Sequence, residues 1–369
     1  MTDKITVGVF FGGRSGEHEV SLLSARSILA NLDPAKYHLI EVGITKEGQW
    51  LSGQDVLEAF QTGRTAHLTP VAMLPHAGDA TLYFLKDGRV EPFTRLDVIF
   101  PVLHGTFGED GTLQGLFELI GVAYVGAGVL ASAVGMDKAL FKTVLRACNL
   151  PILDYLVFTR RMVEEDAEKV IQAIESSLQY PVFIKPANLG SSVGITKCRN
   201  RSDLVEGLYE AARYDRRIIV EQGLEKPREI EVSVLGNEQP EASIPGEVVP
   251  GEDFYTYSAK YLSDNSRLLI PAPLPEEVKQ EIQRIALETY RAIDGAGMAR
   301  VDFLVDRQTH QIYISEVNTI PGFTQISMYP KLWEASGLPY AQLIDRLIEL
   351  AFERKTDRDR TEFHYRREG

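Results

Sequence analysis

Cysteine is nearly missing from this chain of 369 residues, which contains only Cys148 and Cys198 and no CxxC pair. A disulfide-stapled scaffold and a cysteine metal site are therefore excluded, and a reducing compartment is expected. Long apolar runs are missing too, since a run such as 98–103 is far shorter than the roughly 20 residues that span a bilayer. The first residues lack the pattern of a signal peptide. We expect a cytoplasmic protein with no membrane-bound part.

Positively charged residues are fewer than negatively charged ones: the chain has 39 Lys and Arg and 52 Asp and Glu, which gives a formal net charge of −13. Such a chain has no basic field for phosphate backbones, so nucleic acid is excluded as a partner and small-molecule chemistry is favoured. The Walker pattern is absent, since no Gly-Lys dipeptide occurs. The run 126–131 formally matches a dinucleotide fingerprint, but it lacks the acidic residue on a following strand. We interpret it as the entrance to a helix.

The length allows two or three domains, because single hydrophobic cores stop growing near roughly 250 to 300 residues. In the region 1–126, the run KITVGVFFGG followed by a helical pattern predicts a strand–loop–helix unit of an α/β domain. Further strands are expected at 39–44 and 97–102, and 62–87 is interpreted as a peripheral excursion.

Two further regions are expected after this domain, at 127–220 and 221–369. The first has a helix starting near Met136 and then a predicted hairpin, formed by PVFIKPA and VGITKC around a glycine loop. The second has several strands, a Gly/Pro/Tyr-rich loop at 247–265 that could close over a site, and a final helix from Tyr340 to Phe352 followed by a frayed tail. The fold class is α/β and α+β.

The strongest local signal for chemistry is RVDFLV followed by IYISEVN. Side chains two apart on a strand share a face, so Arg300 shares a face with Asp302, and Glu316 with Asn318. If the two strands pair as a hairpin, two carboxylates and an amide oxygen converge, which is a ligand set that suits Mg²⁺. A half-buried hairpin with solvated polar residues is the alternative.

The second signal is GSSVG at 190–194, between two strands and shortly after Lys185. Successive backbone N–H groups of such a loop, with the hydroxyls of Ser191 and Ser192, can cradle a phosphate. A nucleophile elbow with Ser192 would need a helix after the motif, and the sequence predicts a strand. A plain hairpin turn remains the other alternative.

Three other places are candidate binding positions. The first loop, GGRSGEHEVS, leads from a strand into a helix, so the free N–H groups of the helix start and Glu17 would face the same pocket. The alternative is that Glu17 caps the helix or is solvated, as a lone Glu in a loop usually is. His104 follows a buried strand, and a single His at such a point is more often a structural residue than a catalyst. Lys260 and Tyr261 lie in the predicted lid loop.

Together these motifs resemble the D-alanine–D-alanine ligase family of the ATP-grasp superfamily. The resemblance covers nearly the whole chain, in family order: GGRSGEHEVSL, HGTFGEDGTLQG, MDK, KPANLGSSVG, VEQGL, YSAKYLSD, ARVDF and SEVNTIPGFTQISMYP. It implies an N-terminal Rossmann-like (pre-ATP-grasp) domain followed by a two-part ATP-grasp fold. It also implies ATP and Mg²⁺ (or Mn²⁺), D-alanine as both substrates, a D-alanyl phosphate intermediate, a role in peptidoglycan precursor synthesis, and a homodimer.

The resemblance further implies roles for single residues, carried over position by position. The nucleotide would be held by Lys138, Lys185, Ser191, Ser192, Glu221, Gln222, Leu224, Glu229 and Lys260. The metal ligands would be Asp302, Glu316 and Asn318. The substrate residues would be Glu17, His104, Arg300, Gly322, Ser327 and Met328, and the catalytic ones Glu17, Ser191, Tyr261, Arg300 and Ser327.

Two other functions stay open on the sequence. A ligase that makes a D-alanyl ester with D-lactate is close in chemistry, and Tyr261 after Lys260 resembles the dipeptide-forming members. A catalytically silent nucleotide-binding regulator belongs to a different class. Retention of the three metal ligands and of Lys138 and Lys185 argues against it.

Overall fold

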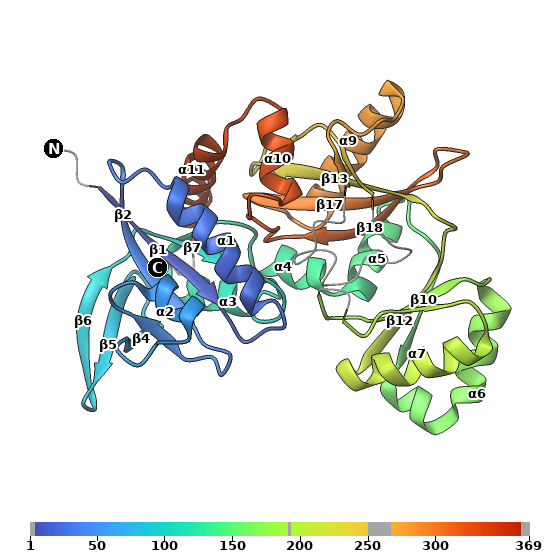
Figure 1. Ribbon diagram of the computed structural model, residues 1–369, viewed down its shortest axis with the longest axis horizontal. Coiled ribbons are helices and arrows are strands. Elements are labelled where there is room, and N and C mark those ends of the chain that lie inside the picture. The colour runs from blue at the N-terminus through green and yellow to red at the C-terminus, as the bar shows by residue number, and fades with distance from the viewer. Residues whose placement is uncertain (1–3, 191–192, 250–266, 363–369) are drawn as a thin grey trace, which may run out of the picture.

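A computed structural model of the chain describes residues 4–190, 193–249 and 267–362. Within these residues the chain forms three β-sheets, each covered by helices (Figure 1). The first region contains β1 (Ile5–Gly12), α1 (His18–Asn31), β2 (Tyr37–Ile44), β3 (Trp50–Ser52), α2 (Val56–Thr62), β4 (Thr69–Met73), β5 (Thr81–Lys86), β6 (Arg89–Arg95), β7 (Val98–Val102), α3 (Thr112–Ile120) and β8 (Ala123–Tyr124).

The elements after it build the other two sheets. They are α4 (Val129–Met136), α5 (Lys138–Ala147), β9 (Tyr155–Thr159), α6 (Arg160–Ser177), β10 (Val182–Pro186), β11 (Thr196–Cys198), α7 (Arg201–Tyr214), β12 (Arg217–Gln222), β13 (Arg228–Leu235), β14 (Glu241–Ala242), β15 (Gly246–Val249), β16 (Arg267–Leu269), α9 (Glu276–Ala292), β17 (Met298–Val305), β18 (Ile312–Asn318), α10 (Met328–Ala335) and α11 (Tyr340–Arg358).

The first sheet has the strand order β6-β5-β4-β3-β2-β1-β7-β8, and β1 pairs in parallel with β2 and β7. Alternation along β1 turns Val7 and Phe11 toward α1 and α11, and Phe10 toward α3 on the opposite face. The predicted strand–loop–helix unit is therefore confirmed. The expected excursion at 62–87 contains β4 and β5, which pair antiparallel and extend the sheet at one edge.

The second sheet has the order β11-β10-β12-β9 and is antiparallel throughout. The predicted hairpin is present, because β10 pairs with β11. Helices α6 and α7 pack their apolar side chains, such as Ile174 and Leu208, against one face of this sheet. Its other face is left for the cavity described below. Upstream, Gly128 is the N-cap residue of α4, as expected for a helix entrance, and the helix expected near Met136 begins at Lys138.

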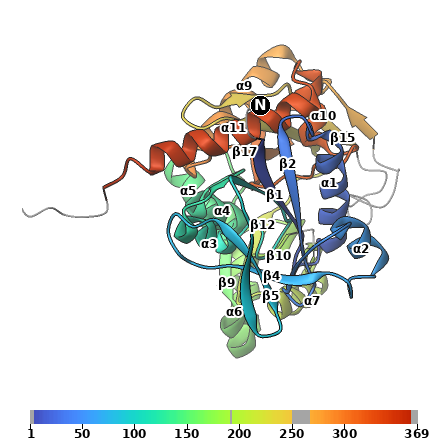
Figure 2. The same ribbon diagram turned by 90° about the vertical axis from the view of Figure 1, so that its left-hand side faces the viewer.

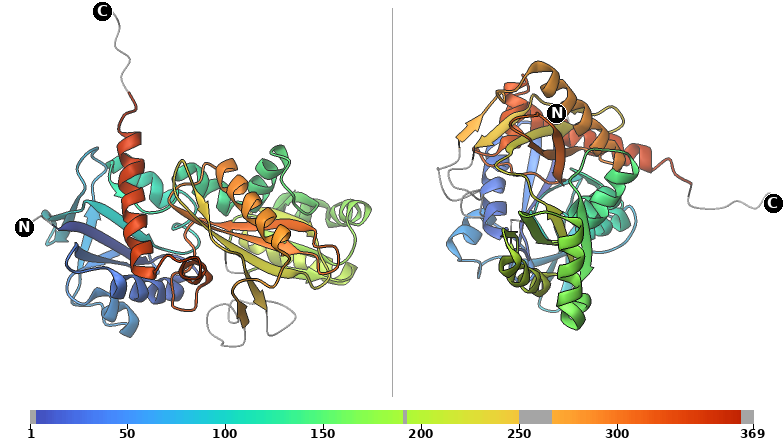
Figure 3. Two further views of the ribbon diagram at one scale, coloured as in Figure 1. Left: turned by 90° about the horizontal axis from the view of Figure 1, so that it is seen from above. Right: turned by 90° about the vertical axis from the view of Figure 1, so that its right-hand side faces the viewer.

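The third sheet has the order β16-β15-β13-β17-β18, with β14 on β13. Helix α9 and the helices α4 and α5 share one hydrophobic cluster with β13, β17 and β18. Polar residues that alternate with this core along β17 and β18 therefore face the opposite side, toward the second sheet. The two sheets lie side by side in Figure 1 and in both views of Figure 3.

The last helix, α11, returns to the first sheet (Figure 2). Its buried residues Leu343, Leu347 and Ile348 share a cluster with β1, β7 and α1. The helix also continues to Arg358, where the sequence analysis expected a frayed tail after Phe352, and Arg358 forms an ion pair with Glu118 of α3. Among the described helices, none combines the length and apolarity needed to cross a membrane.

Candidate active site

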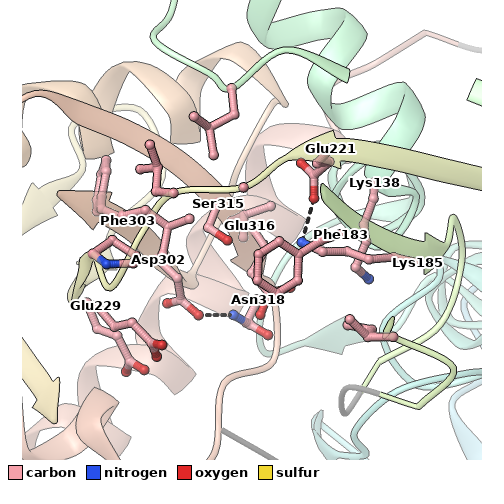
Figure 4. Close-up of a pocket in the computed structure, with 18 of the residues that line it drawn as sticks. Lys138, Phe183, Lys185, Glu221, Glu229, Asp302, Phe303, Ser315, Glu316 and Asn318 are labelled. Carbon is pink, nitrogen blue, oxygen red and sulfur yellow. Dashed lines mark hydrogen bonds and ion pairs between the residues drawn. The ribbon is translucent and has the colours of Figure 1, made fainter. Parts of the chain in front are cut away.

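A cavity of about 720 Å³ lies between the second and third sheets and opens toward the first. This volume is within the range of small-molecule sites, about 300 to 1,000 Å³. Figure 4 shows side chains from β10, β12, β17 and β18 turned into it. The predicted site residues that line it are Glu17, Lys138, Lys185, Glu221, Gln222, Leu224, Glu229, Arg300, Asp302, Glu316 and Asn318.

A buried lysine, Lys142, and a half-buried one, Lys185, share one buried carboxylate at one end of the cavity. Lys142 Nζ lies 2.7 Å from Glu221 Oε1, and Lys185 Nζ lies 2.5 Å from Glu221 Oε2. Burial alone would raise the pKa of Glu221, but the two lysines outweigh it and lower that pKa to about 2. Burial would also lower the pKa of Lys185, yet Glu221 raises it. Lys185 therefore presents a fixed positive charge to the cavity.

Lys138 is held at the start of α5 by its backbone and its side chain. Its N–H donates to Ala187 O at 2.8 Å, and its ammonium donates to Leu189 O at 2.6 Å. The residue before it, Asp137, caps the helix by accepting from Leu140 N at 2.9 Å and forms an ion pair with Arg217 of β12. The ammonium group of Lys138 is thus held in place by the cap of α5 and by the loop after β10.

The two strands with the predicted metal ligands pair as an antiparallel hairpin, as the sequence predicted. Asp302 is opposite Glu316 and Arg300 is opposite Asn318, and a register shift follows directly after Asp302. Opposite residues of an antiparallel pair share a face, so the two carboxylates and the amide point into the same cavity. Asn318 Nδ2 donates to Asp302 Oδ2 at 3.0 Å, drawn as a dashed line in Figure 4.

Arg300 neutralises the acids beside it. Its Nε and Nη2 donate to the two oxygens of Asp302, each at 2.6 Å, and its Nε lies 2.9 Å from Glu231 Oε2. In the part of the chain that the structure describes, no group of three or more His, Cys, Asp or Glu could hold a metal ion. The amide oxygen of Asn318 is therefore needed to complete a set with Asp302 and Glu316. This hard, all-oxygen set fits Mg²⁺, which takes its remaining ligands from water and phosphate.

Glu17 reaches the cavity from the first sheet, directly before α1. Only 7% of the residue is exposed, and two glycines make room for its carboxylate. A Cβ atom at Gly105 would lie 2.5 Å from Glu17 Oε2, and one at Gly190 would lie 2.8 Å from it. The first domain and the glycine loop therefore meet at this carboxylate, in a place that suits a small cation such as an ammonium group.

The other predicted substrate residues lie around the cavity but do not line it. His104 is buried and hydrogen-bonded to Ser24 and to the backbone of Ile320, and its burial lowers its pKa, which favours the neutral ring. Ser327 precedes α10, and a Cβ at Gly322 would lie 2.8 Å from its Oγ. The side chain of Met328 packs in an apolar cluster with Val248 and Leu332. Ser191, Ser192, Lys260 and Tyr261 lie outside the described residues.

Family models match both halves of the chain. The model described as D-ala D-ala ligase N-terminus matches residues 6–127, and the one described as D-ala D-ala ligase C-terminus matches residues 144–349. The chain belongs to the D-alanine–D-alanine ligase family. Curated members of this family include proteins from Natranaerobius thermophilus, 48% identical over 358 residues, and Heliobacterium modesticaldum, 50% identical over 361 residues. Each alignment covers 97% of both chains.

Solved structures of ligases are similar to the whole chain. The D-alanine–D-alanine ligase from Coxiella burnetii matches with a TM-score of 0.84 at 38% identity, covering 97% of each chain. The VanG D-Ala:D-Ser ligase from Enterococcus faecalis matches with a TM-score of 0.84 at 34% identity, covering 95% of this chain and 100% of its own. The predicted ATP-grasp fold of a ligase of this family is thereby confirmed.

The roles of several residues at this ligase site were not predicted from the sequence, among them Glu109, Lys142 and Asp137. Glu109 and Lys142 line the cavity, and Asp137 caps the helix of Lys138. Burial, with the charge of Glu17 adding to it, raises the pKa of Glu109 to about 8. Asp137 and Glu109 lie inside the motifs MDK and HGTFGEDG. The signal that could have identified them is that each is an acidic residue of a family motif to which no role had been assigned. For Lys142, the only signal in the sequence was that it lies four residues after Lys138, on the same face of a helix.

Proposed function

We propose that this chain joins two D-alanine molecules at the expense of ATP, for peptidoglycan precursor synthesis. The observation that carries the proposal is the convergence on one cavity of Lys138 and Lys185, the acids and amide of β17 and β18, and Glu17. A carboxylate is a poor acylating group, so an oxygen of the first D-alanine attacks the γ-phosphorus of ATP and ADP leaves. The amine of the second D-alanine, once it has lost a proton, attacks the carbonyl carbon of the acyl-phosphate, and phosphate leaves.

We assign the nucleotide to the side of the cavity formed by β10 and β12. Lys138 and Lys185 would neutralise phosphate oxygens, because transfer depends on positioning and charge neutralisation. The adenine would lie against residues 221–224, and Glu229 would accept from the ribose hydroxyls. The Glu221 carboxylate is occupied by Lys142 and Lys185, so its contact with the base would run through its backbone. Ser191, Ser192 and Lys260 complete the proposed nucleotide site.

We assign the divalent metal, Mg²⁺ or Mn²⁺, to Asp302, Glu316 and Asn318. Such an ion supplies charge neutralisation to phosphate oxygens when it is bound. Arg300 pairs with Asp302 and Glu231 on the same face. It is placed to stabilise negative charge on the carbonyl oxygen under attack, together with the backbone of Gly322.

We assign the two amino acids to opposite sides of this centre. Glu17 would bind the ammonium group of the first D-alanine, with His104 beside it. Ser327 and the backbone at Met328 would hold the carboxylate of the second. Ser191 and Tyr261 would join Glu17 across the closed site and exclude water, which would otherwise hydrolyse the acyl-phosphate.

The direct test is phosphate release from ATP by the purified chain with Mg²⁺. We expect release that depends on D-alanine and is absent with L-alanine, with the dipeptide appearing in equal amount. Asp302→Asn should lower the rate about a hundredfold or more, because the metal site loses a negative charge without a change in the size of the side chain. The proposal fails if D-alanine brings no phosphate release from a protein that binds ATP.

The identity of the second substrate needs a competition assay, because a solved neighbour is titled a D-Ala:D-Ser ligase. D-Alanine, D-serine and D-lactate would be offered together at equal concentration, and the products separated by mass. We expect D-alanyl-D-alanine to dominate. A homodimer remains a prediction from the resemblance, and a cytoplasmic location remains a prediction from the composition of the sequence.

A further inference from the structure

The segment 319–327, between β18 and α10, has no regular secondary structure and depends on side chains from elsewhere for its shape. Buried backbone groups need hydrogen-bond partners, so each partner that the fold supplies here helps to set the path of the segment. Tyr340 of α11 donates to Phe323 O at 2.7 Å. The other outside partners come from the first domain.

His104 and Ser24 form one chain of hydrogen bonds onto this segment. The neutral His104 ring donates from Nδ1 to Ile320 O at 3.0 Å, so its Nε2 accepts from Ser24 Oγ at 2.9 Å. Ser24 Oγ in turn accepts from Phe323 N at 3.3 Å. The direction of each bond is fixed by its neighbours, because a neutral imidazole has one donor and one acceptor.

Glu109 binds the backbone N–H group of the same residue, Ile320. Its Oε1 accepts from Ile320 N at 3.2 Å, and its Oε2 accepts from Gly105 N at 2.6 Å. Both backbone polar groups of Ile320 are thus held by side chains of one turn, residues 104–109, in a different domain. These two N–H groups favour the ionised carboxylate, with two acceptor oxygens, and so oppose the burial that raises its pKa, whereas an amide would turn a donor toward one of them.

We propose that Glu109 is a positioning residue that fixes segment 319–327 against the first domain, so that the second amino acid is held for attack on the acyl-phosphate. This inference rests on the proposed function, which assigns Gly322 and Ser327 to the second step. Ile320 is two residues before Gly322, so a displaced Ile320 N–H moves the groups that would contact the second amino acid. Formation of the acyl-phosphate uses Glu17, the lysines and the acids of β17 and β18, and does not need this segment.

The test measures a ratio of two products in one reaction mixture. Hydroxylamine added with D-alanine and ATP captures the acyl-phosphate, because its nitrogen attacks the carbonyl carbon and phosphate leaves, giving the hydroxamate. This small nucleophile has no carboxylate to be held by the segment. We expect Glu109→Gln to raise the ratio of hydroxamate to dipeptide about tenfold, as expected for one lost positioning hydrogen bond. The ratio does not depend on how much of the protein is folded.

Asp110→Asn is the matched control. Asp110 is the next residue and also accepts from two backbone N–H groups, those of Phe107 and Thr112, but it does not contact segment 319–327. We expect its product ratio to equal that of the unchanged protein. Ser24→Ala removes the acceptor of Phe323 N and should raise the ratio in the same direction as Glu109→Gln, which keeps the test available if Glu109→Gln fails to fold.

The outcomes separate this inference from the proposed function. If the unchanged protein forms neither product from D-alanine, the proposed function fails. If it forms both and Glu109→Gln leaves their ratio unchanged, Glu109 has no positioning role and the inference is overturned. An equal rise in Asp110→Asn would overturn it as well, because any disturbance of the turn would then have the same effect.

Discussion

Glu221 is a buried charge that the fold tolerates because Lys142 and Lys185 are its partners. Breaking a buried ion pair by removing one partner typically costs about 3 to 5 kcal/mol, since the other charge stays desolvated. Lys142 has 2% of its side chain exposed, and it also donates to Ile314 O on β18. It therefore joins the second and third sheets through Glu221, whose other oxygen pairs with Lys185 at the wall of the cavity.

The ionisation of Glu221 predicts a dependence of stability on pH. Its pKa in the folded chain is about 2, below the ordinary 4.5, so folding favours the ionised form. This stabilisation is complete above pH 4.5 and is lost as the pH falls toward 2. Between pH 5 and pH 3, we expect the free energy of unfolding in urea to fall about 2 kcal/mol further for the unchanged protein than for Glu221→Gln.

The control for this experiment is Glu165→Gln, which removes an exposed pair with Arg161 on α6. Exposed pairs on a helix surface contribute little, so the pH dependence of this variant should follow that of the unchanged protein. Identical pH dependence in the Glu221→Gln protein would mean that the carboxylate is not stabilised by its lysines.

At the scale of elements, the start of α5 links helix stability to nucleotide binding. Asp137→Ala removes both the cap at Leu140 N and the ion pair with Arg217, whereas Asp137→Asn keeps a capping oxygen and loses only the charge. We expect Asp137→Ala to weaken ATP binding about fivefold, because Lys138 is the next residue and the lost cap costs about 1 kcal/mol. Asp137→Asn should fall between it and the unchanged protein.

Titration calorimetry with Mg²⁺ and ATP measures this effect. Asn200→Ala removes the cap of α7, where the Asn200 side chain accepts from Asp203 N at 3.1 Å, away from Lys138. It is the control for the loss of a cap as such. Equal ATP affinity of the Asp137→Ala and Asn200→Ala proteins would show that the cap of α5 does not set the position of Lys138.

Elements with a regular sequence pattern could be predicted, and contacts between distant segments could not. Period-two alternation in RVDFLV and IYISEVN predicted that Arg300 shares a face with Asp302 and Glu316 with Asn318, because strand geometry is local. The short spacer between the two strands then made a hairpin the natural way to bring these residues together. The extension of the first sheet by β4 and β5 was missed, since Pro, His and Gly in 62–87 hide their alternation. The bond from Ile320 N to Glu109 joins residues 211 apart, and no local pattern encodes such a contact.

Across the whole molecule, one hydrophobic cluster joins the beginning and the end of the chain. It contains Val9 and Phe100 of the first sheet, Trp333 of α10 and Leu347 of α11. The hydrogen bonds of His104 and Glu109 to segment 319–327 run across the same junction. Substrate residues of the first domain and of the third sheet are thus placed by a shared core, and these two parts should unfold together.

The two tryptophans allow this to be measured, because Trp50 is in β3 and Trp333 is in α10. Leu347 is fully buried, so Leu347→Ala should lower the free energy of unfolding by about 2 to 5 kcal/mol. In the Trp50→Phe background the fluorescence reports on Trp333, and in the Trp333→Phe background it reports on Trp50. We expect Leu347→Ala to lower the free energy of unfolding in denaturant by the same amount in both backgrounds, each compared with its own parent. Leu119→Ala on α3, where 64% of the side chain is exposed, should change neither. A loss at only one tryptophan would mean that the first domain and α10 unfold separately, and that α11 does not hold them together.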